Sequence, residues 1–306
     1  MSNLRDTVGL CIPCGMANSQ YETEFEPSTG ILWGYLNPRE GAPCFSLGML
    51  KEIAAHEAAF AASNGRVQVD GEAFEVTNYV AASRTPGVFS MGGDLSLFML
   101  LIRTRDRDAL AAYAQLCVDN LYRRVQNYGC PDITTISLVQ GDALGGGFES
   151  VLSSDVIVAE ESAQMGLPEI LFNLFPGMGA YSLLARRIGM RAAEELILSG
   201  KILTAGELHR MGVVDVVATD GQGETAVRNW IARNARRRNG LQAVLRARRL
   251  IHPVTREELD GIVALWVDAA MRLGERDLRM MQRIVRAQMQ PRPREAAAGT
   301  QPLVAA

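Results

Sequence analysis

The sequence has few lysines and histidines and contains no long apolar run. Of its 31 basic residues only Lys51 and Lys201 are lysines, and we draw no functional conclusion from that bias alone. No stretch approaches the roughly 20 apolar residues that span a bilayer. The net charge of −3 gives no reason to expect a nucleic-acid partner. These shortages predict a protein that neither crosses a membrane nor binds nucleic acid.

Cysteines and histidines offer little basis for disulfide bonds or a metal site. The five cysteines are mostly scattered, and an odd number argues against a disulfide framework. Cys11 and Cys14 have the spacing of a redox motif or of half a zinc site. No second pair of this kind follows, and His56, His209 and His252 are single and far apart. We interpret the cysteine pair as a turn in a loose N-terminal segment, and we expect no metal and no cofactor.

Length and composition are typical of a globular enzyme-sized chain. With 306 residues, 48% of them hydrophobic and 21% charged, the chain can form one large α/β domain with a helical appendage. Its first residues contain an acid and too short an apolar run for a secretory signal. We therefore expect a cytoplasmic location.

Strand-like and helix-like segments alternate along most of the chain. Apolar, β-branched runs at 76–82, 133–139 and 156–159 are typical of buried strands, and helical patterns lie between and after them. From about residue 224 the pattern is wholly helical. This order predicts a parallel sheet covered by helices. We divide the chain into an N-terminal extension (1–28), an α/β core (29–222), a helical module (223–290) and a disordered tail (291–306).

Two glycine loops each follow a predicted buried strand and precede a helix. Residues 91–94 have the sequence MGGD, and residues 145–147 are all glycine. Glycine lets the backbone approach a ligand closely, and a helix start leaves free N–H donors. Two such donors aimed at one point form an oxyanion hole. Each loop could equally be a tight turn that needs positive φ, and neither matches a phosphate-binding pattern.

Two glutamates stand near these loops. Glu149 directly follows the second glycine loop, and Glu169 follows Pro168 within the apolar stretch 165–172. Apolar surroundings raise the pKa of a carboxyl group, which suits it to general acid or base catalysis. Two such groups can divide the work between them. The alternative is that Glu149 only stabilises its helix start while Glu169 forms a structural ion pair.

Four segments in order resemble the crotonase (enoyl-CoA hydratase/isomerase) superfamily. They are LNPR at 36–39, FSMGGDL at 89–95, LGGGFE at 144–149 and GLPEI with FPGMG across 166–179. The likeness covers about residues 30–290. It implies an α/β fold in which ββα units form a spiral, with C-terminal helices that help to build a homotrimer or hexamer. It also implies that Gly93 and Gly146 supply the oxyanion N–H groups, and that Glu149 and Glu169 are the catalytic pair of a hydratase.

The sequence departs from plain hydratases in several places. Residues 92–94 are Gly-Gly-Asp where Gly-Ala-Asp is usual, Asn173 stands where glycine is common, and segment 55–75 is enlarged. These features resemble one branch, the synthases of diffusible signal factor, a cis-2-unsaturated fatty acid. That resemblance implies dehydration of a 3-hydroxyacyl thioester on acyl carrier protein, followed by hydrolysis that releases the free acid. An acyl-CoA thioester is the other possible substrate form.

Residues around the second glutamate are candidates for the wall of an acyl-chain pocket, although ordinary core packing explains them as well. These candidates are Met165, Leu171, Phe172, Asn173, Phe175 and Met178.

A run of arginines without an acid follows the predicted core. It comprises Arg228, Arg233, Arg236, Arg237, Arg238, Arg246, Arg248, Arg249 and Arg256. This run could steer an acidic carrier protein or contact phosphates. A solvated helix face or a subunit contact explains it equally. Replacing Arg236, Arg237 and Arg238 with alanine is expected to raise the apparent KM for a carrier-bound substrate if they form a docking surface.

Two other functions remain open from the sequence. An enoyl-CoA hydratase of fatty-acid breakdown would hydrate a trans-2-enoyl thioester reversibly and release no acid. A crotonase-like chain without activity would act as a binding partner, for instance of a sensor protein. Retention of both glutamates argues against the inactive form, but it does not exclude a binding role beside catalysis.

Overall fold

The protein was analysed as a computed structural model that describes residues 19–39 and 41–288. For residues 287 and 288 it describes the backbone alone. The Cys11–Cys14 pair and the predicted tail lie outside the described residues.

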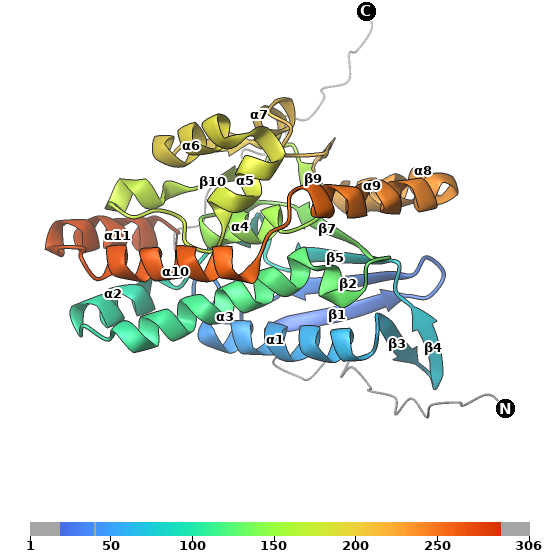
Figure 1. The fold of residues 1–306 in the computed structure, drawn as a ribbon, viewed down its shortest axis with the longest axis horizontal. Helices are drawn as coiled ribbons and strands as arrows, with labels where there is room; N and C mark the ends of the chain where they lie inside the picture. The colour runs from blue at the N-terminus through green and yellow to red at the C-terminus, as the bar shows by residue number, and fades with distance from the viewer. Residues whose placement is uncertain (1–18, 40, 289–306) are drawn as a thin grey trace, which may run out of the picture.

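A six-stranded sheet forms the centre of the molecule (Figure 1). In spatial order the strands are β1 (Tyr21–Glu26), β2 (Ile31–Leu36), β5 (Asn78–Ser83), β7 (Thr134–Val139), β9 (Val156–Glu160) and β12 (Val216–Ala218). The edge strand β1 pairs antiparallel with β2, and all other neighbouring strands of this sheet pair in parallel. Strands β7 and β9 are buried throughout, as expected for apolar runs without alternation. Because β1 belongs to this sheet, the sheet begins before the predicted core boundary at residue 29.

A second, four-stranded sheet lies beyond the first. Its order is β11 (Ile202–Thr204), β10 (Gln164–Gly166), β8 (Asp142–Leu144) and β6 (Val88–Ser90). Three times the chain passes from a central strand of the first sheet to a strand of the second and then into a helix: β5 to β6, β7 to β8, and β9 to β10. This repeat confirms the predicted spiral of ββα units. It also aligns β6, β8 and β10 in parallel, so their carboxyl ends meet at one edge.

Helices cover the sheets, and several begin at a side-chain cap. Asp94 caps α2 (Leu95–Arg103), Asp106 caps α3 (Arg107–Val125), and Thr204 with Glu207 forms a full capping box on α7 (Ala205–Arg210). The helices beside and after the sheets are α1 (Leu47–Ala62), α4 (Gly146–Leu152), α5 (Ala180–Ile188), α6 (Met190–Ser199), α8 (Gly223–Asn234), α9 (Arg238–Ile251), α10 (Arg256–Ala270) and α11 (Glu275–Gln288). The hairpin of β3 (Arg66–Val69) and β4 (Glu72–Glu75) accounts for part of the enlarged segment 55–75.

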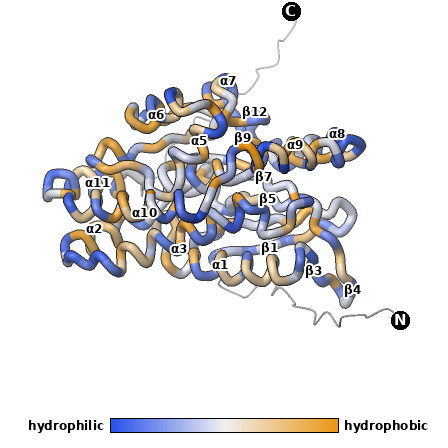
Figure 2. Tube along the Cα trace, viewed as in Figure 1, coloured by the Kyte–Doolittle hydropathy of each residue, from blue (hydrophilic) through white to orange (hydrophobic). Residues whose placement is uncertain are grey.

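The C-terminal helices fold back over the α/β core, so the helical module is confirmed. Helix α10 lies along α3, and α11 packs beside α2 (Figure 1). In Figure 2, α11 alternates between hydrophilic and hydrophobic colours along its length, as an amphipathic helix must. Its buried residues Leu278 and Met281 join the same core cluster as Trp266 of α10. The helical module is therefore packed against the part of the core that holds the glycine loops.

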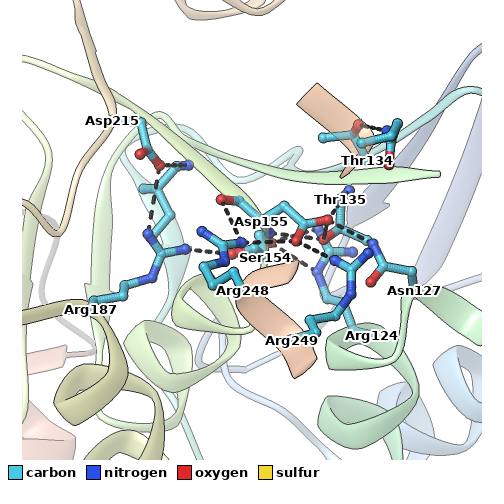
Figure 3. Close-up of polar contacts among 12 residues, drawn as sticks. Arg124, Asn127, Thr134, Thr135, Ser154, Asp155, Arg187, Asp215, Arg248 and Arg249 are labelled. Atoms are coloured by element: carbon cyan, nitrogen blue, oxygen red, sulfur yellow. Dashed lines mark hydrogen bonds and ion pairs between the residues drawn. The ribbon is translucent and has the colours of Figure 1, made fainter. Parts of the chain in front are cut away.

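A buried carboxylate ties α9 to the sheet. Asp155, at the start of β9, accepts hydrogen bonds from Arg248 and Arg249 of α9, each at 2.9 Å (Figure 3). Its other oxygen accepts from the Asn127 side chain at 2.6 Å and from the backbone N–H of Thr135 at 3.2 Å. A buried carboxylate with this many donors is well compensated for its lost hydration. Part of the predicted arginine run is thus used for internal structure.

Candidate active site

The predicted site residues meet where β6, β8 and β10 end. Gly93 lies in the loop after β6, and Gly146 and Glu149 lie at the start of α4, directly after β8. Glu169 lies in the short 3-10 helix η2 (Pro168–Phe172) after β10. Since the three strands are neighbours, all four residues line one cavity.

The backbone N–H groups of two residues that line this cavity, Gly93 and Gly146, have no partner among the described residues. A Cβ atom placed on Gly146 would lie 3.3 Å from the backbone nitrogen of Gly93, so the two residues are in close approach. Gly146 is the first residue of α4, and the N–H of a residue at this position has no acceptor within its own helix. Neither N–H donates a hydrogen bond to any residue that the structure describes. An oxyanion hole requires two free donors close to one point, so this pair stays a candidate for that role.

Glycine is required at two positions that bring the loops together. Gly145 has φ 53° and ψ −126°, a conformation that side chains disfavour. A Cβ atom there would lie 2.5 Å from Oε1 of Glu169. Gly92, with φ 88°, would place a Cβ atom 2.7 Å from the carbonyl oxygen of Leu144. The two glycine loops therefore contact each other through backbone, which fixes the N–H groups relative to the carboxyl groups.

Glu149 is 2% exposed and is held by backbone donors. Its Oε1 accepts hydrogen bonds from the N–H of Met178 at 2.8 Å and from that of Ala180 at 3.0 Å. Burial raises the pKa of the Glu149 carboxyl to about 7, although these hydrogen bonds favour its charged form. The group is thus a carboxylate that can still take up a proton near neutral pH.

Glu169 lacks comparable support. Its Oε2 is buried and has no hydrogen-bond partner among the described residues. Burial, together with the negative charge of Glu149, raises the pKa of the Glu169 carboxyl to about 8. Both carboxyl groups therefore take up a proton more readily than ordinary glutamates, and Glu169 more so because it lacks the backbone donors of Glu149. A carboxylate and a carboxylic acid in one cavity can act together as base and acid.

Tyr113 of α3 holds the first glycine loop, a role that the sequence analysis missed. Its hydroxyl accepts a hydrogen bond from the N–H of Asp94 at 3.2 Å and donates one to the carbonyl oxygen of Phe45. Asp94 directly follows Gly93, so this bridge restrains the direction of the Gly93 N–H. A tyrosine in mid-helix carries no sequence signal for such a role, because both of its partners are distant in the chain.

The predicted pocket residues fall into separate places. Phe172 and Met178 line the cavity. Met165 is fully buried in β10, and Phe175 is half-buried against the same core; neither lines the cavity. Leu171 and Asn173 line a hollow on the outer side of η2. The sequence analysis missed several apolar lining residues from other helices, namely Leu95, Phe98, Cys117, Trp266 and Ile284.

Asn173 has a structural role that accounts for its departure from glycine. It ends η2 in the left-handed conformation, with φ 62°, which asparagine tolerates better than most residues. Its side-chain amide donates to Asp277 of α11 at 3.5 Å. The substitution therefore keeps the turn and adds a contact to the C-terminal helix.

The cavity is small in this structure. Its volume is about 50 Å³, whereas a cavity of roughly 150 Å³ is known to hold benzene. An acyl chain therefore enters only if lining side chains shift. Met178 lines the cavity, and its unbranched, adaptable side chain can shift to admit an acyl chain.

The described residues contain no group of three or more metal-ligating side chains. Cys44, Cys117 and Cys130 are free thiols. Among the described residues, no helix is both long and apolar enough to cross a membrane.

Comparison with known proteins identifies the family of the chain. Residues 72–262, well over half of the chain, match the family model described as enoyl-CoA hydratase/isomerase. The chain therefore belongs to the enoyl-CoA hydratase/isomerase family, and the resemblance to this superfamily is confirmed.

Individual relatives are similar over about half of the chain. Mouse mitochondrial methylglutaconyl-CoA hydratase is 33% identical over 155 residues, which are 50% of this chain and 47% of that protein. The peroxisomal fatty acid beta-oxidation multifunctional protein AIM1 of Arabidopsis thaliana is 31% identical over 144 residues, which are 47% of this chain and 19% of that protein. The matched segment thus spans less than half the length of these relatives.

Solved structures show the same fold at lower identity. Human mitochondrial delta3-delta2-enoyl-CoA isomerase is similar with a TM-score of 0.67 and 20% identity, over 88% of this chain and 97% of that one. Pseudomonas aeruginosa DspI is similar with a TM-score of 0.59 and 22% identity, over 75% and 88%.

Proposed function

We propose that the protein dehydrates a 3-hydroxyacyl thioester to the cis-2-enoyl thioester and then hydrolyses that thioester to release the free fatty acid. One observation carries the proposal. Two carboxyl groups with raised pKa values, those of Glu149 and Glu169, line one cavity beside two backbone N–H groups that lack a partner among the described residues.

Dehydration uses the two carboxyl groups once each. The ionised glutamate removes a proton from the carbon next to the thioester carbonyl, and the protonated one donates its proton to the 3-hydroxyl, which leaves as water. The carbon–carbon double bond forms between these two positions. Charge that develops on the thioester oxygen is stabilised by the N–H groups of Gly93 and Gly146. The pair ends with one proton, now on the other glutamate.

Hydrolysis would use the same donors. Water adds to the thioester carbonyl while a carboxylate takes its proton, and the tetrahedral oxyanion lies on the same two N–H groups. When the intermediate collapses, the carbon–sulfur bond breaks and the proton passes to the leaving thiolate. Both steps place negative charge on one oxygen, so a single site serves both.

The second candidate is an enoyl-CoA hydratase, the same chemistry run in reverse on a trans-2-enoyl thioester. Similarity to a protein named methylglutaconyl-CoA hydratase favours it. The inactive binding partner is disfavoured, because Glu149 and Glu169 line one cavity together with both glycine loops, an arrangement that a binding role alone does not require. A cytoplasmic location, a sensor-protein partner and a trimeric or hexameric state remain predictions.

One experiment separates these candidates. The protein is incubated with a 3-hydroxyacyl carrier protein, and the products are resolved by mass spectrometry with separation of cis and trans isomers. Free cis-2-enoic acid is the expected product, whereas trans-enoyl thioester alone would establish the hydratase. Glu149→Gln and Glu169→Gln should each abolish dehydration.

Glu57 supplies the matched control for these variants. It is also a buried glutamate whose pKa burial raises to about 8, but it lies on α1 and does not line the cavity. Glu57→Gln should leave turnover within about twofold. Full activity in either cavity variant would assign the chemistry to other residues.

A further inference from the structure

A hollow separate from the catalytic cavity lies between η2 and α11. Its volume is about 630 Å³. One side is lined by Leu171 of η2 and by Asn173, which directly follows η2, and the other by Arg276, Arg279 and Arg283 of α11. The spacing of the three arginines places them on one face of the helix. The hollow is thus a groove with a cationic wall.

These three arginines are free of internal partners, unlike much of the predicted basic run. Within the described residues none of them has an ion pair or hydrogen bond. By contrast, Arg246 pairs with Asp132, and Arg248 and Arg249 pair with Asp155. Arg236, Arg237 and Arg238 also form no ion pair among the described residues, so α11 and the segment around 236–238 both present unpaired positive charge.

The one acid in this groove is already engaged. Asp277 accepts hydrogen bonds from the N–H of Gly274 at 3.0 Å and from the side chain of Asn173 at 3.5 Å. It neutralises at most one of the three arginines. The groove therefore keeps a net positive charge that an anionic partner would complement.

The groove and the catalytic cavity share a wall. Phe172 faces the cavity while its neighbours Leu171 and Asn173 face the groove. On α11, Ile284 lines the cavity and the adjacent Arg283 lines the groove. A partner bound in the groove would thus lie directly behind the site where its thioester reacts.

We propose that this groove docks an acidic, amphipathic helix of the carrier protein that delivers the acyl thioester. The assignment rests on the proposed function, because it takes the substrate to be carrier-bound. We favour it over the arginines around 236–238, because the groove shares a wall with the catalytic cavity.

Apolar surface within the groove favours a protein over a free diphosphate. Leu171 is 54% exposed and Met280 is 37% exposed, and both lie among the arginines. A diphosphate would use the cations alone. An amphipathic helix would cover the two apolar side chains and present its acids to the arginines around them, the usual arrangement of a helix in a groove.

Charge reversal tests the proposal with a control of equal charge change. Arg276→Glu, Arg279→Glu and Arg283→Glu are combined in one protein, and Arg236→Glu, Arg237→Glu and Arg238→Glu in another. Apparent KM is measured with three forms of the same 3-hydroxyacyl group: on carrier protein, on coenzyme A and on N-acetylcysteamine. Binding of unacylated carrier protein is measured by calorimetry.

The α11 variant should raise KM for the carrier-bound form at least about tenfold and lose carrier binding. Its turnover of the N-acetylcysteamine form should stay within about twofold, and the control variant should behave like the unmodified protein. Equal effects in both variants, no effect on carrier binding, or an equal rise for the coenzyme A form would each overturn the proposal. If the unmodified protein dehydrates none of the three forms, the proposed function fails, while the calorimetry still decides the docking surface.

Discussion

The hydroxyl of Tyr113 can be removed while the shape of the cavity is kept. Phenylalanine retains the ring, which packs edge-to-face on Phe98 with centroids 5.0 Å apart. The change deletes both hydrogen bonds of the hydroxyl, to the carbonyl oxygen of Phe45 and from the N–H of Asp94. Tyr113→Phe therefore releases the loop that aims the Gly93 N–H and keeps the packing of the ring.

The expected size of the effect follows from these contacts. Complete loss of one oxyanion donor costs about 10²–10³ in kcat. In the variant the loop keeps the hydrogen bond from the N–H of Phe45 to the carbonyl oxygen of Gly92, at 2.7 Å, so the donor is loosened and not lost. We expect kcat to fall about 10- to 100-fold and KM to change less than about threefold. Two stranded polar groups should also lower the free energy of unfolding by about 1–3 kcal/mol each.

Steady-state kinetics and infrared spectroscopy measure this effect. The carbonyl stretch of a bound thioester analogue should shift to higher frequency in Tyr113→Phe, because the oxyanion hole polarises it less. Tyr128→Phe is the control: it removes a buried hydroxyl that bonds Arg124 at 2.9 Å and does not line the cavity. It should lose stability but keep kcat. An unchanged kcat and an unchanged carbonyl frequency in a folded Tyr113→Phe would refute the positioning role.

Four further predictions concern the carboxyl pair and the anchor of α9. Gly145→Ala combines backbone strain of about 1–3 kcal/mol with displacement of Glu169, and it should lower kcat/KM about 100-fold. Gly189→Ala is the control: Gly189 also has a positive φ, 84°, but no atom lies within 4 Å of the added Cβ, so only the melting temperature should fall. Because burial raises the pKa of both carboxyl groups toward neutrality, the pH profile of kcat/KM should be bell-shaped with its maximum near neutral pH, and a monotonic profile would contradict an acid–base pair. The pKa values of both carboxyl groups in the folded protein exceed the value of 4.5 for an unfolded glutamate, so the free energy of unfolding falls as pH rises from 4.5 to about 8. Glu169→Gln removes the charge that forms on Glu169, so the variant should have a higher melting temperature than the unmodified protein above pH 8, and no higher one below pH 4.5. Asp155→Ala leaves the largely buried Arg249 without its ion pair and Asn127 and Thr135 without their acceptor, and it should cost about 3–5 kcal/mol in urea unfolding without changing kcat.

Local sequence patterns were sufficient to predict the central strands of the first sheet and to name the candidate catalytic residues. The apolar runs of β7 and β9, the two glycine loops and the glutamates after them are each encoded within a few residues. Such signals are local because strand burial, positive φ and a helix start depend on neighbouring residues. The family followed from the order of four such segments.

The tertiary structure alone decided which distant groups meet. It made the ends of β6, β8 and β10 neighbours, and so gave Glu149 two backbone donors while leaving an oxygen of Glu169 unpartnered among the described residues. It also separated Phe172 from Leu171 on opposite sides of η2, and free arginines on α11 from paired ones on α9. Sequence could not show these outcomes, because a pKa, a hydrogen bond or an ion pair depends on partners that only folding brings within reach.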